Sequence, residues 1–299
     1  MKLLTYTVDK RNKQKLGVLS QNEEWIYPLT SFGIEYKNML DLISSMTESE
    51  SQLLTYASRK DPDAVPGAVC LKEVKLLAPI PVPSQDIVCL GINYMAHAEE
   101  SARFKNEKFN GERPYAVYFS KRVNQCLEPE GMIPSYPGFV ESLDYEAELA
   151  VILKKDAKNV PAEQAKDYIF GYTILNDVSA RDIQNRHKQW YFGKSLDGFC
   201  PMGPWIVTAD SFSFPPKLGI SCRVNGELRQ NSNTADLIFG LEHIISELSQ
   251  GMTLKAGTII STGTPSGVGM GFTPPKFLKS GDIVECSIEG IGTLRNTVQ

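Results

Sequence analysis

The sequence has few histidines, no closely paired cysteines and no long apolar run. Its six cysteines are scattered and form no C-x-x-C pair, which argues against zinc ribbons and thioredoxin-type motifs. Scattered cysteines of this kind are typical of reduced thiols, so we expect a cytoplasmic protein. No apolar run approaches the ~20 residues that span a bilayer. The first residues alternate like a strand and lack the apolar stretch of a signal peptide.

Charge patterning gives no sign of a macromolecular partner. The net charge is −4, and lysines and arginines form no cluster longer than a few residues. We therefore expect no nucleic-acid partner and no membrane partner. With 299 residues, of which 42% are hydrophobic and 22% charged, the composition is that of an ordinary globular protein. This length allows one large domain or two unequal ones, with enough core to need no disulfides.

The chain divides near residue 80. Residues 1–80 are expected to form a small N-terminal domain and linker, with three short strands before residue 30 and a helical stretch over 38–59. The linker is the proline-punctuated segment 78–84. In the larger part, residues 81–299, strands predominate, among them those expected at 139–153, 169–176 and 283–288, and they do not alternate strictly with helices. We therefore expect an α+β fold rather than a doubly wound sheet.

Three carboxylates are the most informative feature. Glu146 and Glu148 stand in a segment whose apolar residues alternate as in a strand, so they project from the same face. Asp177 ends another apolar run, 172–177, directly after the strand expected over 169–176. If the three converge, each pair at ~4 Å repels by about 4 kcal/mol at an effective dielectric of ~20. Such a cluster needs protons or a hard cation such as Mg²⁺, Mn²⁺ or Ca²⁺. The alternative is a half-buried strand with its acids on the solvated face.

A histidine and a glutamate at helical spacing form a second candidate group. His97 lies three residues before Glu100, so the two side chains would meet on one helical turn. The carboxylate would orient the ring, and the imidazole would take a proton from water. Small residues around His97 fit a mobile segment that orders over a site. The alternative is a solvated pair on a surface helix.

The segment after Asp177 offers polar groups on a predicted helix. Ser179 and Asp182 have the S-x-x-D spacing of a helix start. Arg181 and Gln184 are three residues apart and therefore share a face near Asp177. A guanidinium and an amide there suit a carboxylate-bearing substrate. The alternative is a capped surface helix.

Two further motifs need care. Gly193-Lys194-Ser195 is not a phosphate-binding loop, because lysine stands where that motif needs its first glycine. Lys194 is either a buried ammonium near the acids or a surface lysine. The glycine-rich segment 262–271 lacks dinucleotide-binding spacing. It either presents backbone N–H groups and the Thr264 hydroxyl to an anionic ligand or forms a plain turn.

The order of these motifs resembles the fumarylacetoacetate hydrolase family over roughly residues 80–299. Five motifs carry the resemblance: N-Y-x-x-H-x-x-E at 93–100, D-Y-E-A-E-L-A at 144–150, N-D-V-S-A-R-D-x-Q at 176–184, G-K-S-x-D-x-F-C-P-x-G-P at 193–204 and T-G-T-P-x-G-V-G at 262–269. The animal enzymes add a fourth acidic metal ligand from an earlier segment, which has no match here. The smaller bacterial acylpyruvase-like branch is therefore the better comparison.

The resemblance implies a fold and a set of site residues. The expected fold is a mixed β-sandwich roll of the fumarylacetoacetase C-terminal type, preceded by a small α+β domain. Matched to the family, Glu146, Glu148 and Asp177 would bind Mg²⁺ or Mn²⁺. The water-activating dyad on a lid would be His97 and Glu100, with Lys194 stabilising negative charge. Three matched positions would hold substrate oxygens: Arg181, Gln184 and Thr264.

The expected substrate is a small 2-oxo acid that chelates the metal. We expect hydrolysis of a C–C bond in a β-diketo acid of the acylpyruvate type, through an enolate. Oxaloacetate decarboxylation and keto–enol tautomerisation could use the same metal site, and a non-catalytic metal-binding protein is a further alternative. The loops 101–113 and 266–278 are expected to set specificity. The resemblance also implies a homodimer.

Overall fold

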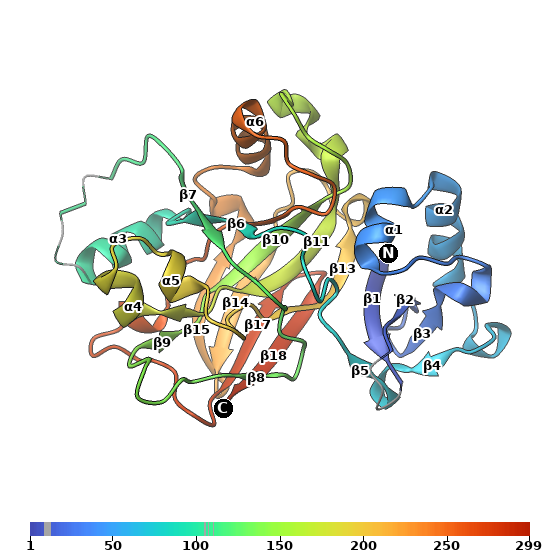
Figure 1. The fold of residues 1–299 in the computed structure, drawn as a ribbon, viewed down its shortest axis with the longest axis horizontal. Helices are drawn as coiled ribbons and strands as arrows, with labels where there is room; N and C mark the ends of the chain where they lie inside the picture. Colours follow the sequence, from blue (N-terminus) through green and yellow to red (C-terminus); the bar gives the residue numbers. More distant parts are fainter. Residues whose placement is uncertain (9–12, 105, 107, 110) are drawn as a thin grey trace.

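The computed structural model describes residues 1–8, 13–104, 106, 108–109 and 111–299. Within this part of the chain, two β-sheets form the body and helices cover its edges and ends (Figure 1). No helix there is long and apolar enough to cross a membrane. The predicted α+β class, with a mixed sheet roll and a small N-terminal α+β part, is confirmed.

The larger sheet runs through both parts of the chain. Its order is β4-β3-β2-β1-β13-β11-β10-β16-β6-β7, and β5 pairs with β1. Most neighbours are antiparallel, but β16 and β6 are parallel. The strands are β1 (Lys2–Thr7), β2 (Lys15–Leu19), β3 (Trp25–Pro28), β4 (Val69–Cys70), β5 (Lys75–Leu76), β6 (Ile87–Gly91), β7 (Val117–Lys121), β10 (Ala147–Leu153), β11 (Ile169–Asn176), β13 (Met202–Thr208) and β16 (Ile259–Ser261).

The second sheet has the order β15-β14-β17-β18-β8 and packs against the first through β14, β17 and β18. The two-stranded ribbon of β12 and β9 stands apart. The strands are β8 (Met132–Ile133), β9 (Leu143–Asp144), β12 (Ser179–Ala180), β14 (Gly219–Val224), β15 (Glu227–Asn233), β17 (Ile283–Ile288) and β18 (Gly292–Val298).

Strand β10 lies at the centre and is buried on both faces. Leu149 and Val151 pack into the core between the two sheets, while Ala150 and Ile152 pack into the core that also holds α1 and α2. The period-two alternation predicted for this segment is therefore present, but neither face is solvated. The predicted single strand is interrupted between β9 and β10.

The helices and 3₁₀ turns occupy the margins of the sheets. The α-helices are α1 (Met39–Ser45), α2 (Glu48–Ala57), α3 (Met95–Phe104), α4 (Arg181–Arg186), α5 (Tyr191–Lys194) and α6 (Leu241–Gly251). The 3₁₀ turns are η1 (Leu29–Phe32), η2 (Pro62–Ala64), η3 (Leu71–Glu73), η4 (Ala162–Tyr168), η5 (Ala209–Ser211), η6 (Thr234–Asp236) and η7 (Gly269–Gly271).

Two helix predictions need correction. The stretch 38–59 is two helices, because Thr47 caps α2 through a capping box with Glu50 and so starts a new helix. Ser179 does not cap α4. It lies in β12 and its hydroxyl donates to the carbonyl of Asp177, while Ala180 takes the N-cap position without a side-chain bond. The S-x-x-D pattern was therefore a wrong indication of the helix start.

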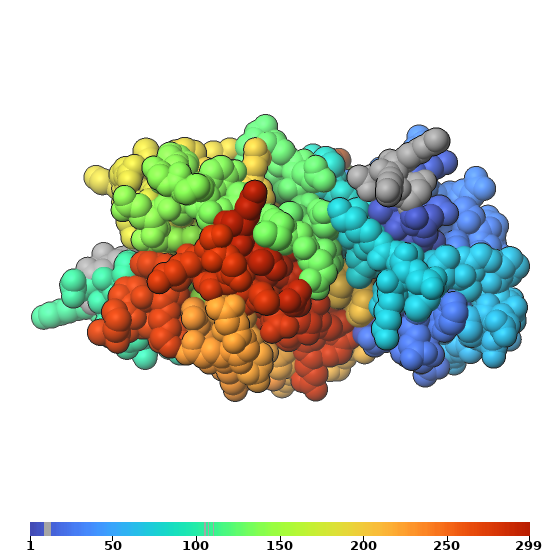
Figure 2. All heavy atoms as spheres, turned by 90° about the horizontal axis from the view of Figure 1, so that it is seen from below, coloured from blue at the N-terminus to red at the C-terminus, as the bar shows by residue number. Residues whose placement is uncertain are grey.

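The N-terminal part extends the main sheet. Strand β1 pairs antiparallel with β13, placing Leu3 opposite Ile206. In the space-filling view this part lies at one end of the molecule, and the segment around residues 70–85 runs between it and the rest (Figure 2). The division near residue 80 stays a prediction, with the added observation that backbone hydrogen bonds cross it.

Candidate metal centre and active site

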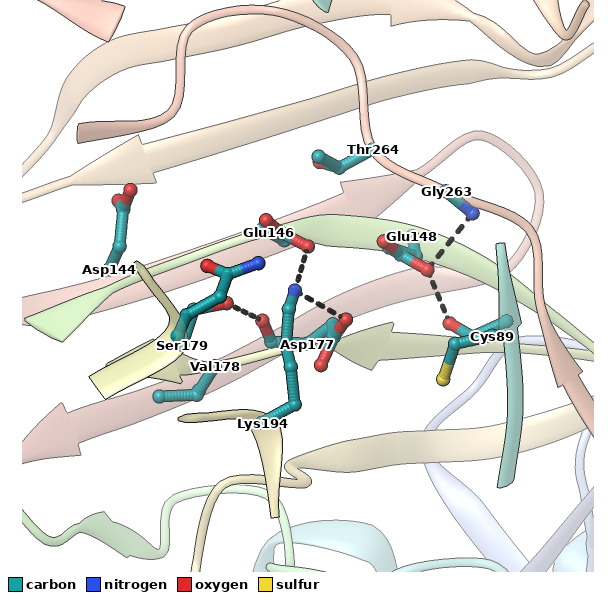
Figure 3. Close-up of polar contacts among 12 residues, drawn as sticks. Cys89, Asp144, Glu146, Glu148, Asp177, Val178, Ser179, Lys194, Gly263 and Thr264 are labelled. Atoms are coloured by element: carbon teal, nitrogen blue, oxygen red, sulfur yellow. Dashed lines mark hydrogen bonds and ion pairs between the residues drawn. The ribbon is translucent and has the colours of Figure 1, made fainter. Parts of the chain in front are cut away.

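Glu146, Glu148 and Asp177 converge in the interior. One oxygen from each lies within 4.8 Å of the others, and all three residues are buried. The solvated strand face that was the alternative for the two glutamates is thereby excluded. Figure 3 shows the three carboxylates facing one another.

The backbone explains the convergence. Strands β10 and β11 are antiparallel, with Ala147 opposite Asn176. Just beyond this pair, the Asp177 N–H donates to the Glu146 carbonyl at 2.9 Å. The Asn176 side chain returns the contact by accepting the Glu146 N–H at 3.0 Å. These two hydrogen bonds hold Asp177 beside Glu146. Glu148 is two residues further along the chain, so its side chain projects from the same face as that of Glu146.

Two buried lysines neutralise part of this charge. Lys194 Nζ lies between Glu146 Oε2 and Asp177 Oδ2, at 2.6 and 2.7 Å (Figure 3). Lys121 Nζ donates to Asp177 Oδ1 at 2.6 Å and to the Val178 carbonyl at 3.0 Å. Burial lowers the pKa of Lys194, but Asp177 and Glu146 raise it, and the net shift is upward. Of the two alternatives that the sequence allowed for Lys194, a buried ammonium and a surface lysine, the structure shows the buried ammonium.

Arg181 connects the triad to Asp144. Its Nη2 lies 2.7 Å from Glu146 Oε1, and its Nε donates to Asp144 Oδ2 at 2.9 Å. Its Nη1 donates to Gln184 Oε1 at 3.1 Å, as expected for residues three apart on a helix. Burial raises the pKa of Glu146, but Lys194 and Arg181 more than offset this and hold it below its ordinary value.

Glu148 has a different environment. Its Oε2 accepts from the Ser261 hydroxyl at 2.5 Å and from the Gly263 N–H at 3.0 Å, both neutral donors. Burial, together with the negative charges of Asp177 and Glu146, raises the pKa of Glu148 well above its usual range. Because both donors reach Oε2, Oε1 is the oxygen left for a cation among the described contacts. Glu148 is thus the carboxyl with most to gain from a positive ion.

This donor set fits a hard divalent cation. Three buried carboxylates supply oxygen ligands at close range, which suits Mg²⁺ or Mn²⁺ better than softer ions. The cation would relieve the repulsion that the two lysines leave uncompensated at Glu148.

The predicted dyad is present on α3. His97 Nδ1 lies 3.0 Å from Glu100 Oε2, and both side chains are buried. Glu100 Oε1 accepts the N–H of Gly267 at 2.9 Å, which docks α3 onto the glycine-rich loop. Because the carboxylate accepts, His97 donates through Nδ1, and Nε2 is the ring nitrogen left to take a proton. The solvated-helix alternative is excluded by this burial.

A narrow pocket of about 30 Å³ is lined by His97 of the dyad and by Glu146 of the triad. Its polar lining includes most of the predicted site residues: His97, Glu146, Arg181, Gln184 and Lys194. Phe119, Trp190 and Met270 supply apolar walls. Residues 105, 107 and 110 of the predicted specificity loop 101–113 lie outside the described residues.

Thr264 lies near the site, but its hydroxyl is engaged. It donates to the Ala147 carbonyl at 2.9 Å and accepts from Gln230 Nε2 at 2.7 Å. These bonds hold the glycine-rich loop against β10 beside the triad. Substrate binding by Thr264, like that by Arg181 and Gln184, stays a prediction.

Sequence reasoning missed three buried polar residues at the site: Lys121, Asp144 and Ser261. Lys121 ends an apolar strand segment, where a lysine is unusual, and that position was the available signal. Asp144 lies inside a motif that was recognised but had no role assigned. Ser261 ends β16 and gave no signal of its own.

The fold and site together define a β-rich α+β protein with a buried carboxylate site suited to a divalent cation. The family model for the fumarylacetoacetate (FAA) hydrolase C-terminal domain matches residues 86–299. The chain therefore belongs to the fumarylacetoacetate hydrolase family, as the motifs indicated.

Several relatives and solved structures resemble the chain over most of its length. Oxaloacetate tautomerase YisK of Bacillus subtilis is 47% identical over 83% of this chain and 80% of its own length. A mitochondrial oxaloacetate tautomerase of Xenopus laevis is 43% identical, over 75% and 68% of the two chains.

Two solved structures cover essentially the whole chain. A fumarylacetoacetate hydrolase from Exiguobacterium antarcticum has a TM-score of 0.83 at 37% identity, covering 100% of this chain and 99% of its own. A maleylpyruvate hydrolase from Sphingobium, solved with manganese(II) and pyruvate, has a TM-score of 0.76 at 29% identity, covering 100% and 98%.

Proposed function

We propose that the protein is a divalent-metal-dependent tautomerase that interconverts the keto and enol forms of oxaloacetate. The observation that carries this proposal is the position of His97. A base with its Nδ1 bonded to Glu100 lines the same narrow pocket as Glu146 and Lys194. The similarity to two oxaloacetate tautomerases supports this choice of reaction among those first considered.

Glu146, Glu148 and Asp177 would hold Mg²⁺ or Mn²⁺. When bound, such an ion polarises the 2-oxo group and stabilises the negative charge of an enolate. Lys194 adds a positive charge beside the same carboxylates, and its raised pKa keeps it protonated. Arg181 fixes Glu146 from the other side. In this proposal the bound 2-oxo acid would lie with its C3 carbon toward His97, which lines the same pocket as Glu146 and Lys194.

The proton transfer then falls to the dyad. His97 Nε2 takes a proton from C3, the C3–H electrons form the C2–C3 double bond, and the carbonyl electrons move to the oxygen at C2. That oxygen takes up a proton from water, and His97 releases its own to water, so the proton count is unchanged. Glu100 stabilises the imidazolium.

Hydrolysis of an acylpyruvate-type β-diketo acid is the second candidate. It is favoured by the dyad, which could activate water instead of C3, and by the likeness to a maleylpyruvate hydrolase. Decarboxylation would rely on the cation and Lys194 without needing the base. A non-catalytic metal-binding protein would need no base at all.

The test is a direct comparison of three substrate assays with purified protein and Mn²⁺ or Mg²⁺. The enol absorbance of oxaloacetate reports tautomerisation, pyruvate release reports decarboxylation, and acetylpyruvate loss reports hydrolysis. We expect metal-dependent acceleration of the first. Equal enol decay with and without protein would overturn the tautomerase proposal, and acetylpyruvate cleavage alone would support the second candidate.

The cytoplasmic location and the homodimer belong to the proposal as well. All six cysteines are free thiols, which supports a reducing compartment. Light scattering of the purified protein measures the oligomeric state directly.

A further inference from the structure

The glycine-rich loop contacts the helix that carries the catalytic base. Glu100, on α3, divides its two carboxylate oxygens between different partners. Oε2 meets His97 Nδ1 at 3.0 Å, and Oε1 accepts the Gly267 N–H at 2.9 Å. The same carboxylate thus orients the base and anchors α3 to residues 267–271. Without the anchor, the base would lose a fixed position over the pocket.

The loop is itself anchored from the metal side. Asp144 accepts the N–H of Gly269 at 2.6 Å through Oδ1 and that of Met270 at 3.1 Å through Oδ2. Its Oδ2 also accepts from Arg181 Nε at 2.9 Å, and Arg181 pairs with Glu146. Polar contacts therefore run from the proposed metal ligand Glu146 through Arg181 and Asp144 to the loop, and the loop backbone completes the path to Gly267 and Glu100. Asp144 is fully buried, so these bonds are not exchanged with water.

Gly271 shapes the place where Glu100 docks. A Cβ on Gly271 would overlap the carboxylate and Cγ of Glu100, and no other atom is closer. Gly271 does not have a positive φ, so alanine meets no backbone strain there. The cost of a side chain at this position therefore falls on the docked Glu100 and not on the loop.

We propose that residues 267–271 form a latch that seats Glu100, and that Gly271 and Asp144 are positioning residues for the His97 base. The proposal rests on the proposed proton transfer by His97. It goes further, because it makes the reactive geometry of the base depend on a loop that contributes no group to the chemistry. Arg181 and Asp144 connect the state of the metal centre to that loop.

Gly271→Ala is the sharpest test, with Gly251→Ala as the matched control. Gly251 ends α6, has no positive φ and has no atom within 4 Å of a built Cβ. We expect Gly271→Ala to lower kcat for oxaloacetate tautomerisation by at least about ten-fold, a part of the 10²–10⁴-fold that a positioned base supplies. KM and Mn²⁺ affinity should stay within about two-fold of wild type, because no ligand to the metal is touched.

Hydrogen exchange gives a readout that is independent of activity. In Gly271→Ala, the amides of α3 should exchange faster than in wild type, while those of β10 should not change. The control should match wild type in both measurements. The double variant Glu100→Ala/Gly271→Ala should be no slower than Glu100→Ala alone, because Gly271 acts through Glu100.

Any one of three results would overturn the latch proposal. The first is a wild-type kcat in Gly271→Ala, and the second is equal amide hydrogen exchange of α3 in wild type and Gly271→Ala. The third is a kcat of the double variant far below that of Glu100→Ala. If wild type shows no tautomerase activity, the proposed function fails, and the exchange of α3 alone decides on the latch.

Discussion

Replacing Lys194 with methionine should destabilise the metal-free protein far more than the metal-loaded protein. Lys194 Nζ is buried and lies 2.6 Å from Glu146 and 2.7 Å from Asp177. Each contact is worth about 6 kcal/mol of Coulomb energy at an effective dielectric of ~20, most of which offsets the cost of burying the charges. Removing one partner of a buried ion pair typically costs about 3–5 kcal/mol. A divalent cation on the same carboxylates would replace much of the lost charge.

The assay is urea unfolding of wild type and variant in a chelator and in Mn²⁺. Lys255→Met is the matched control, because Lys255 pairs with Asp156 at a similar 2.7 Å but on the surface. That pair should contribute little to stability, because solvent screens the attraction between exposed charges. The reasoning is refuted if Lys194→Met in chelator loses no more stability than Lys255→Met. It is also refuted if the difference in unfolding free energy between wild type and Lys194→Met is as large in Mn²⁺ as in chelator.

Further predictions follow from the same contacts. His97→Gln should lower kcat by about 10²–10⁴-fold with unchanged Mn²⁺ affinity, and steady-state kinetics with a metal titration would show a wrong assignment if both changed together. Arg181→Lys should lower activity at least about ten-fold, because an ammonium cannot reproduce the forked contacts to Asp144 and Glu146; full activity would contradict that role. Thr47→Ala should cost about 1 kcal/mol of stability in urea unfolding without affecting activity, since its capping box lies in the N-terminal part; lost activity would contradict this separation.

The strands in residues 81–299 were the most predictable elements. The predicted strands 169–176 and 283–288 coincide with β11 and β17. Apolar and β-branched residues identify the interior of each strand, and turn residues on either side identify its ends. The break before β10 was missed, since apolar alternation continues across Glu146 while the backbone changes partners. Period alone could not reveal that both faces of β10 are buried.

The site was predictable as a set of motifs but not as a network. The motifs located the carboxylates and the dyad, whereas Lys121 and Asp144 act through partners 56 and 37 residues away. Such pairings depend on strand register, and a single sequence does not give the register between distant strands. For the same reason, the sequence could not predict whether Lys194 is buried or exposed.

The central claim is that Glu146, Glu148 and Asp177 hold one divalent cation. Titrating the protein with Mn²⁺ while following the electron paramagnetic resonance signal of the free ion measures this directly. We predict one bound ion per chain in wild type and at least about 100-fold weaker binding in Glu148→Gln, a loss expected when a ligand itself is removed. Equal Mn²⁺ binding by wild type and Glu148→Gln would contradict the account.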